Sequence, residues 1–258
     1  MRSERQDSGI DTDTDTDTDT DTDTDTDTDG DTAVSKIPGF HIHARPEAAL
    51  GDALLQRYRG FPVANVSDAM SRTTGTSALR PFHRRQGPLV GRALTVRTRP
   101  GDNLMVHQAI DICGPGDVIV VDAGGAGPNA IIGEIMLALM MARGAAGIVI
   151  DGLIRDSDTI GQHELPVYAR GVSHRGPYKD GPGELHVPVS IDGMVVHPGD
   201  LVLGDGDGLL AVPAAEAAAI ADRVEAIQRD EADVLAAIAA GRADRSWVAR
   251  TLAAKGVL

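Results

Sequence analysis

The chain has 258 residues, a formal net charge of −14 at pH 7 and one cysteine, Cys113. A single cysteine excludes an intramolecular disulfide and a cysteine metal cluster, and it fits a reducing cytoplasm. Aromatic residues make up 3% of the chain and lysine and arginine do not cluster, so the sequence lacks the stacking and electrostatic signatures of nucleic-acid binding.

The sequence predicts neither a secretory signal nor a membrane span. The N-terminus lacks the apolar core of a signal peptide. The apolar stretch at residues 130–142 is about thirteen residues long and contains Glu134, so it is too short and too polar to span a bilayer. We therefore expect a cytoplasmic protein.

Low complexity dominates residues 1–32, in which an Asp-Thr repeat runs from Asp11 to Thr28. This segment holds 13 of the 38 acidic residues and two of the 24 basic ones, so it carries 11 of the 14 net negative charges. A carboxylate that alternates with a small hydroxyl residue cannot bury apolar surface, so we predict a disordered acidic tail. Cation binding is the alternative, but the repeat lacks the glycine turn and terminal glutamate of an EF-hand loop. Residues 33–258 are expected to form one domain.

Helices and strands alternate in the first half of this domain. Apolar spacing predicts helices at 47–60 and at 65–72, the second with Ser67 as its N-cap. The next elements are a strand at 91–98, a helix at 102–112, a buried strand at 117–125, a helix of about fourteen residues that ends at Gly144, and a strand that begins at Gly147. This order predicts a β-α-β unit with a right-handed parallel crossover.

Short β runs and two helices make up the second half. The runs lie at 166–171, 186–191, 193–200 and 201–213, separated by Gly, Pro and Asp, with Asp205 and Asp207 in a turn. A helix at 214–241 has an apolar stripe at Ile220, Val224, Ile227 and Val234 or Leu235, and a short helix at 245–256 follows it. We expect these helices to pack against a neighbouring subunit.

The glycine-rich turn after the strand at 117–125 is the first candidate for ligand binding. Gly124, Gly125 and Gly127 permit a tight turn that is expected to lead into the N-terminus of the next helix, where N–H groups favour an anion. Their spacing matches neither the Rossmann fingerprint nor a P-loop. A plain strand-to-helix turn is the alternative.

Charged residues gather where the next strand ends. The stretch GIVIDGLIRDSDTI at 147–160 places Asp151, Arg155, Asp156 and Asp158 at or after the carboxyl end of an apolar strand. Neighbouring parallel strands end at the same edge of a sheet, so we expect Arg155 and Asp156 to lie close to Glu134 at the preceding helix start. An arginine can hold a carboxylate, and an aspartate suits a hard divalent cation.

The pattern Gly133-Glu134, twenty residues, Arg155-Asp156 resembles the RraA-like family. GDVIVVDAGG precedes it, GDLVLGDGDGLLAVP follows it, and the likeness extends from Phe61 to Pro213. The family includes 4-hydroxy-4-methyl-2-oxoglutarate and 4-carboxy-4-hydroxy-2-oxoadipate aldolases. The resemblance implies an α/β fold of the swivelling β/β/α type, a single domain with C-terminal helices, and a homotrimer or a hexamer built as a dimer of trimers.

The resemblance also implies site residues. Asp156 would bind Mg²⁺ or Mn²⁺, Arg155 would hold the pyruvate moiety, and Glu134 would hold metal-bound water where these aldolases have the shorter Asp. The residues whose backbone amides would receive the pyruvate carboxylate are Gly133, Glu134, Ile135 and Met136. An acid from the C-terminal helix of a neighbouring subunit completes the site in these aldolases, and Glu231 is the candidate here.

The remaining candidates have structural alternatives. Asn65 and Asp68 could line the site, although Ser67 and Asp68 are equally well explained as capping residues. Three histidines could act as bases, but no spacing between them forms a ligand pair: His107, His163 and His174. An iminium mechanism would need a lysine, and Lys179 is the credible one because Lys36 and Lys255 lie near the chain ends.

A class II aldolase is therefore the expected function. Cleavage of a 4-hydroxy-2-oxo dicarboxylic acid leaves a pyruvate enolate, which a Lewis acid stabilises, and oxaloacetate would lose carbon dioxide through the same enolate. The alternative is a non-catalytic regulator that binds a ribonuclease or another protein, as some RraA-like proteins do. The label of menaquinone methyltransferase, used for other relatives, has no support in the position of the glycines.

Overall fold

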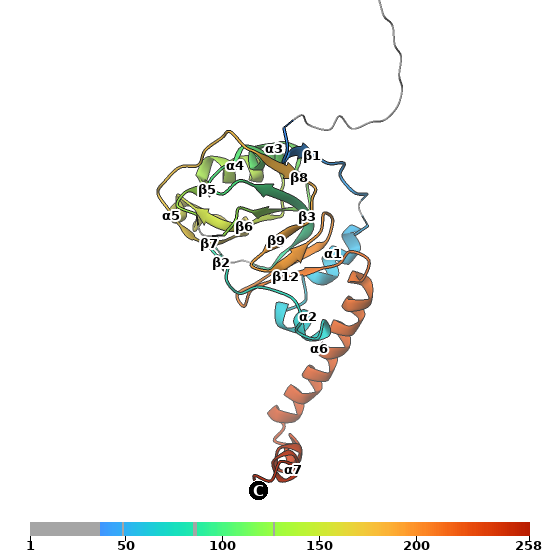
Figure 1. Cartoon of the computed structure of the whole chain (residues 1–258). Coiled ribbons are helices and arrows are strands. Elements are labelled where there is room, and N and C mark those ends of the chain that lie inside the picture. Colours follow the sequence, from blue (N-terminus) through green and yellow to red (C-terminus); the bar gives the residue numbers. More distant parts are fainter. Residues whose placement is uncertain (1–36, 48, 85–86, 126) are drawn as a thin grey trace, which may run out of the picture. The chain divides into compact units, whose positions relative to one another are not determined.

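Four parallel strands form the centre of the main sheet. The computed structural model describes residues 37–47, 49–84, 87–125 and 127–258 (Figure 1). Within them β3 (Leu89–Thr98), β4 (Asp117–Asp122), β6 (Gly147–Ile154) and β7 (Val167–Val172) pair in this order, all in parallel. Parallel strands end at the same edge, so the residues that follow β4, β6 and β7 lie near one another. The Asp-Thr repeat lies outside the described residues, so the predicted disorder and the alternative of cation binding in this segment stay predictions.

Shorter strands extend this sheet. Its order is β1-β8-β3-β4-β6-β7-β2, with β11 joined to β3, β12 joined to β11, and β5 joined to β6. The added strands are β1 (Phe40–Ile42), β2 (Arg80–Pro81), β5 (Ala130–Ile132), β8 (Gly183–Leu185), β11 (Leu201–Gly204) and β12 (Leu209–Val212). A separate hairpin consists of β9 (Val189–Ile191) and β10 (Met194–Val196).

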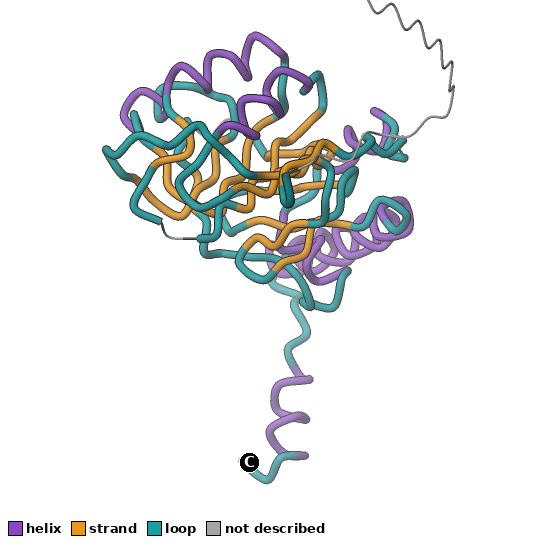
Figure 2. The backbone as a smooth tube through the Cα atoms, turned by 45° about the horizontal axis from the view of Figure 1, so that its top comes forward, coloured by secondary structure: helices purple, strands orange, loops and turns teal. Residues whose placement is uncertain are grey.

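Apolar side chains fill both faces of the sheet. On one face α3 (Leu104–Ile112) and α4 (Glu134–Arg143) cover the central strands (Figure 2). Val106 and Leu137 of these helices pack there against alternate residues of the strands. On the other face the β9–β10 hairpin packs on the intervening residues. A third cluster joins β11 and β12 to α1 (Asp52–Tyr58), α2 (Val63–Ala69) and α6 (Ala217–Ala239). The predicted α/β class is confirmed.

Several predicted element boundaries are wrong. The helix expected at 47–60 is limited to α1, and the second helix begins at Val63 after Pro62. Ser67 therefore lies inside α2 and is not its N-cap. Proline suits the start of a helix because its φ is already helical and its missing N–H has no intrahelical acceptor there.

The glycine turn does not lead directly into α4, contrary to expectation. β5 intervenes and pairs with β6, and α4 then has ten residues instead of about fourteen. Gly144 ends the helix as predicted, with a φ of 75° that favours glycine. The β5 strand was not predicted because three apolar residues show no periodicity.

The C-terminal helix buries only its first half in this chain. Ile220 and Val224 pack in the third cluster, whereas Val234 and Leu235 are 58% and 65% exposed. The predicted apolar stripe of α6 is therefore buried only in its first half. None of the residues of α7 (Ser246–Ala254) is buried. Among the described residues, no helix combines the length and the apolar character that crossing a membrane requires.

Asp151, near the end of β6, joins three segments that support the edge of the sheet. Its carboxylate accepts hydrogen bonds from the guanidinium of Arg170 on β7, with Nη2 at 3.2 Å, and from the backbone N–H of Asp192 at 2.8 Å. Its backbone carbonyl accepts one from Gly125 at 3.0 Å. Asp151 is 5% exposed, so this acid of the 147–160 stretch stabilises the edge instead of facing solvent.

Replacing Asp151 with Ala should lower the free energy of unfolding by about 3 kcal/mol, because it leaves Arg170 without its main partner. The expected change for Asp233→Ala, an exposed acid on α6, is within about 0.5 kcal/mol. Urea denaturation of both variants measures the difference. Equal stabilities would show that the Asp151 contacts contribute little.

Candidate active site

Arg155 and Asp156 directly follow β6 at the edge where the parallel strands end. The short helix α5 (Ser157–Ile160) begins at the next residue. Asp156 has a left-handed backbone conformation, with φ 57° and ψ 35°, which is uncommon for residues other than glycine. Such outliers persist where surrounding contacts hold them, and they concentrate at functional sites.

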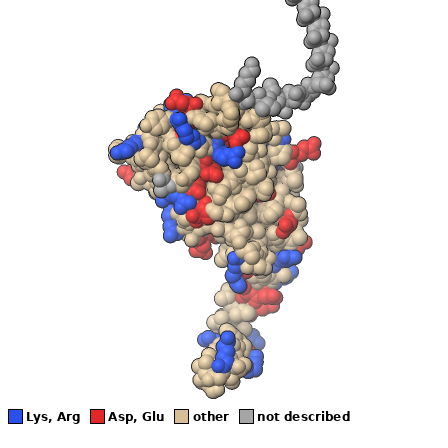
Figure 3. Space-filling view, viewed as in Figure 1, with Lys and Arg blue, Asp and Glu red and all other residues tan. Residues whose placement is uncertain are grey.

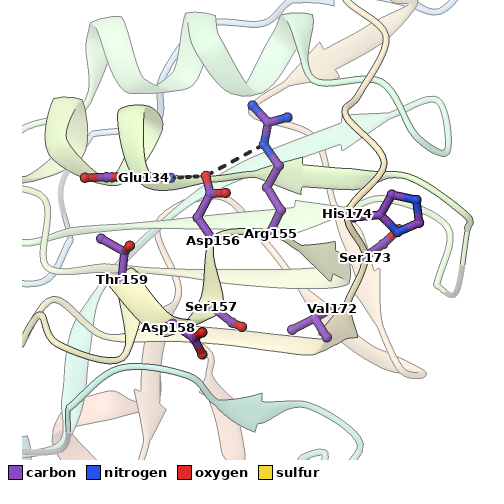
Figure 4. Close-up of a pocket in the computed structure, with 9 residues that line it drawn as sticks. All are labelled: Glu134, Arg155, Asp156, Ser157, Asp158, Thr159, Val172, Ser173 and His174. Carbon is purple, nitrogen blue, oxygen red and sulfur yellow. Dashed lines mark hydrogen bonds and ion pairs between the residues drawn. The ribbon is translucent and has the colours of Figure 1, made fainter.

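The carboxylate of Asp156 contacts the N-terminus of α4. Its Oδ2 atom accepts a hydrogen bond from the backbone N–H of Glu134 at 3.0 Å and lies 3.7 Å from Nε of Arg155 (Figure 4). N–H groups in the first helical turn favour negative charge because they lack intrahelical acceptors. The structure thus brings Arg155, Asp156 and the helix start together.

Glu134 contributes its backbone to this contact. It is the first residue of α4, as the sequence predicts, but its side chain points away from Arg155 (Figure 4). The expected convergence therefore holds for the side chains of Arg155 and Asp156 and for the main chain of Glu134.

Glycine at position 133 is required by the close approach of Asp156. A β-carbon on Gly133 would collide with Oδ2 of Asp156 and lie 3.0 Å from Cγ of Arg155. The φ of Gly133 is −148°, which any residue can adopt, so side-chain space and not backbone conformation selects glycine here.

Two pockets meet at Arg155. The larger has a volume of about 680 Å³ and the narrower one about 90 Å³. The larger pocket is lined by Glu134, Arg155, Asp156, Ser157, Asp158, Thr159, Val172, Ser173 and His174. We call the narrower one the Lys179 pocket, and it is lined by Asn103, His107, Ile131, Ile132, Gly133, Ile135, Met136, Arg155, Pro177 and Lys179.

Asp156 fits a divalent cation that takes most of its ligands from water or substrate. In the described part of the chain, no three His, Cys, Asp or Glu side chains are grouped to enclose a metal ion. Mg²⁺ commonly binds through one or two carboxylates and keeps several waters. The Asp156 side chain is 42% exposed and uses Oδ2 for the Glu134 N–H, which leaves Oδ1 for such a cation.

His107 is a neutral base in the Lys179 pocket. Burial lowers its pKa below the ordinary value and the positive charge of Lys179 lowers it further, while Asp111 acts in the opposite direction. The imidazole is therefore mainly neutral at pH 7 and able to accept a proton.

Asn65 and Glu231 lie apart from these pockets and contact one another. Nδ2 of Asn65 on α2 donates to Oε2 of Glu231 on α6 at 2.8 Å, within one chain. Asp68 pairs with Arg72 at 2.6 Å. None of the three is among the described residues that line either pocket, so one chain does not bring them to Arg155 and Asp156.

The other sequence candidates are divided between the pockets and the surrounding loops. His174 and Asp158 line the larger pocket, and Lys179 lines the narrower one. His163 and the glycines 124, 125 and 127 line neither, judged on the described residues.

Asn103 was not predicted as a site residue. It precedes α3, where asparagine is an ordinary helix-start residue, and its contact with Ile131 spans 28 positions. The sequence carries no local signal for such a contact.

The comparisons with known proteins agree with this fold. The RraA-like model, described as Aldolase/RraA, matches residues 63–211. A protein of Halalkalibacterium halodurans, provisionally named a 4-hydroxy-4-methyl-2-oxoglutarate aldolase, is 35% identical over 69% of this chain and 84% of its own length. A 4-hydroxy-4-methyl-2-oxoglutarate aldolase of Thermus thermophilus is 34% identical over 48% of this chain and 74% of its own.

A solved structure is also similar. The RNA-processing inhibitor RraA from Thermus thermophilis has a TM-score of 0.55 and 29% identity, covering 59% of this chain and 92% of its own. The chain has an α/β fold in which charged residues follow β6 and lie beside a helix start. The family model matches more than half of the chain, which is enough to assign the family. The chain belongs to the RraA-like family, and the predicted fold is confirmed.

The pKa of His107 should respond to its two charged neighbours in opposite directions. Lys179→Met should raise this pKa while leaving it below the ordinary value, because burial is the larger cause. Asp111→Asn should lower it further. Titration of the His107 ring proton by NMR measures both shifts, and a wild-type pKa at or above 6.5 would contradict the burial argument.

Proposed function

We propose that this protein is a cytoplasmic, divalent-metal-dependent class II aldolase. It cleaves a 4-hydroxy-2-oxo dicarboxylic acid into pyruvate and a second oxo acid, and it decarboxylates oxaloacetate as a side reaction. The observation that carries the proposal is the contact between Asp156 and the start of α4, with Arg155 beside it at the mouth of a large pocket.

Arg155 binds the 2-oxo group of the substrate in this proposal, and the α4 N-terminus binds its carboxylate. Cleavage breaks the C3–C4 bond, and the electron pair moves to form the C2–C3 enolate. The C4 hydroxyl loses its proton and becomes a carbonyl, and C3 then takes up a proton to give pyruvate. The guanidinium of Arg155 donates hydrogen bonds to the oxygen on which negative charge develops.

Asp156 is the residue that would hold Mg²⁺ or Mn²⁺. A cation held there would supply Lewis-acid chemistry to the reaction. Glu134 begins the adjacent helix turn, and its side chain would act on water near that cation only after turning from the direction that it has in Figure 4. His107, whose pKa is lowered by burial, is the candidate to accept the hydroxyl proton.

Arg155→Ala and Asp156→Ala should each lower pyruvate release by at least about a thousand-fold, because each removes charge stabilisation of the enolate. Release from 4-hydroxy-4-methyl-2-oxoglutarate and from oxaloacetate is measured with Mg²⁺ and again after EDTA, which should abolish both. Circular dichroism and the melting temperature serve as folding controls, with the exposed Asp233→Ala as a matched loss of charge. Substantial activity in Asp156→Ala would contradict the assignment.

A homotrimer, or a hexamer of two trimers, is the proposed assembly. The distal part of α6 exposes Val234 and Leu235 beside Glu231, and isolated helices are marginal in water without a packing partner. A second copy that covers this face would bring Glu231 toward another subunit, although within one chain Glu231 bonds to Asn65. Substrate is the other partner, with neither nucleic acid nor membrane involved. On the face in Figure 3, lysine and arginine lie among acids over the sheet, whereas the C-terminal helix shows basic residues alone.

A non-catalytic regulator is the second candidate, favoured by the similarity to an RNA-processing inhibitor. It would bind a ribonuclease or another protein, with the acidic segment 1–32 as an interaction arm. A pull-down with and without residues 1–32, from cells that lack the aldol substrate, separates this role from catalysis.

A further inference from the structure

The strand β1 and the residues that follow it cover one edge of the main sheet. β1 pairs in parallel with β8, and the backbone N–H of His43 donates to the carbonyl of Leu185 at 3.2 Å. Arg45 then forms an ion pair with Asp117, whose side chain is 2% exposed. We call residues 40–45 the strap. It lies before the segment that the RraA-like model matches, so it is an addition to the family core.

The strap also holds the loop between β7 and β8. This loop, residues 173–182, contributes Pro177 and Lys179 to the Lys179 pocket. The ring of Phe40 packs so closely on Gly181 that a β-carbon at this position would lie 2.6 Å from Cε2 of the ring. Departure of the strap would therefore release the end of a loop that lines a pocket.

A buried histidine faces the strap. His186 directly follows β8 and is 9% exposed, and its Nδ1 atom has no hydrogen-bond partner in the described part of the chain. Burial lowers the pKa of His186 and Arg45 lowers it further, whereas Asp117 raises it and His43 adds a last lowering contribution. The ring is therefore neutral at pH 7 while the strap is docked.

Protonation of His186 would oppose docking of the strap. The charge would be buried and would lie near the positive Arg45, while Asp117 already pairs with Arg45 and accepts a hydrogen bond from the Gly114 N–H at 2.9 Å. When the strap leaves, the pKa of His186 returns toward its ordinary value of 6.5. The released state then takes up a proton that the docked state resists. Docking thus weakens as the pH falls below about 6.5.

His43 acts in the opposite direction, through Glu184. Its Nε2 atom lies 3.5 Å from Oε1 of Glu184, and Arg97 holds the pKa of this carboxyl below its usual range. A protonated His43 would strengthen that ion pair and favour docking. His41 stacks edge-on against His43, with ring centroids 4.2 Å apart. The His43 side chain is 43% exposed, so its ion pair contributes less than the buried charge on His186.

We propose that the strap is a pH-sensitive latch that opens when His186 is protonated. At neutral pH the uncharged ring allows Arg45 to reach Asp117 and β1 to pair with β8. In acid the strap leaves the sheet edge, and the loop at 173–182 loosens with it. The latch goes beyond the proposed function, because it acts on this loop whichever ligand the pocket binds.

Amide hydrogen exchange of the full chain at about pH 7.5 and about pH 5, corrected for intrinsic rates, tests the latch. In the wild type, protection of the strap and of Gly181 should fall about five-fold between these values, while residues 148–150 of β6 stay protected. His186→Asn should abolish the fall, and asparagine suits the left-handed φ of 58° at this position. His163→Asn, between α5 and β7, is the matched control and should leave the fall unchanged.

A second variant keeps the test decisive if His186→Asn does not fold. Arg45→Met should reduce the fall without abolishing it, because the pKa of His186 rises when this cation is removed but burial remains. Equal protection of the wild-type strap at both pH values, or an unchanged fall in His186→Asn, would overturn the proposal. A fall in the strap without one at Gly181 would overturn the coupling to the loop.

Discussion

The hydrogen bond from the Glu134 N–H to the Asp156 carboxylate is the constraint on which the site depends. It ties the end of β6 to the start of α4, two elements that are neighbours in space, through residues 22 positions apart in sequence. The contact needs a glycine at 133, where a β-carbon would collide with Asp156. It also needs the left-handed turn at Asp156, which directs that carboxylate back toward α4.

Residues on the opposite face of the sheet support the contact between Glu134 and Asp156. Asp151 lies shortly before Arg155 in the chain and is held by Arg170 and by the β9–β10 turn. The pairing of β6 with β7 shifts register between Ile150 and Leu153, so the strand bends just before the functional pair. The buried Asp151 on one face of the sheet thus fixes the backbone of β6. The exposed side chains of Arg155 and Asp156 extend from this backbone on the other face.

The sequence predicts those parts of the protein whose signals are local. Buried parallel strands such as β4 and β6 are continuous apolar runs, and Gly144 is a helix terminator, so the β-α-β core follows directly. The pairing of Arg155 with Asp156 near Glu134 follows from parallel strands sharing an edge. Three-residue strands such as β5 and β8 carry too little pattern, and the direction of the Glu134 side chain depends on tertiary contacts.

Two pockets of different charge meet at Arg155. Asp156 and Arg155 line the larger pocket, whereas Arg155 and Lys179 line the narrower one, in which none of the described lining residues is acidic. Oxaloacetate has a carboxylate but no hydroxyl beside the bond that breaks. In the proposed function its decarboxylation would draw on Arg155 and on the proposed cation. Both reactions of the proposed function would then depend on the larger pocket, because they pass through the same enolate.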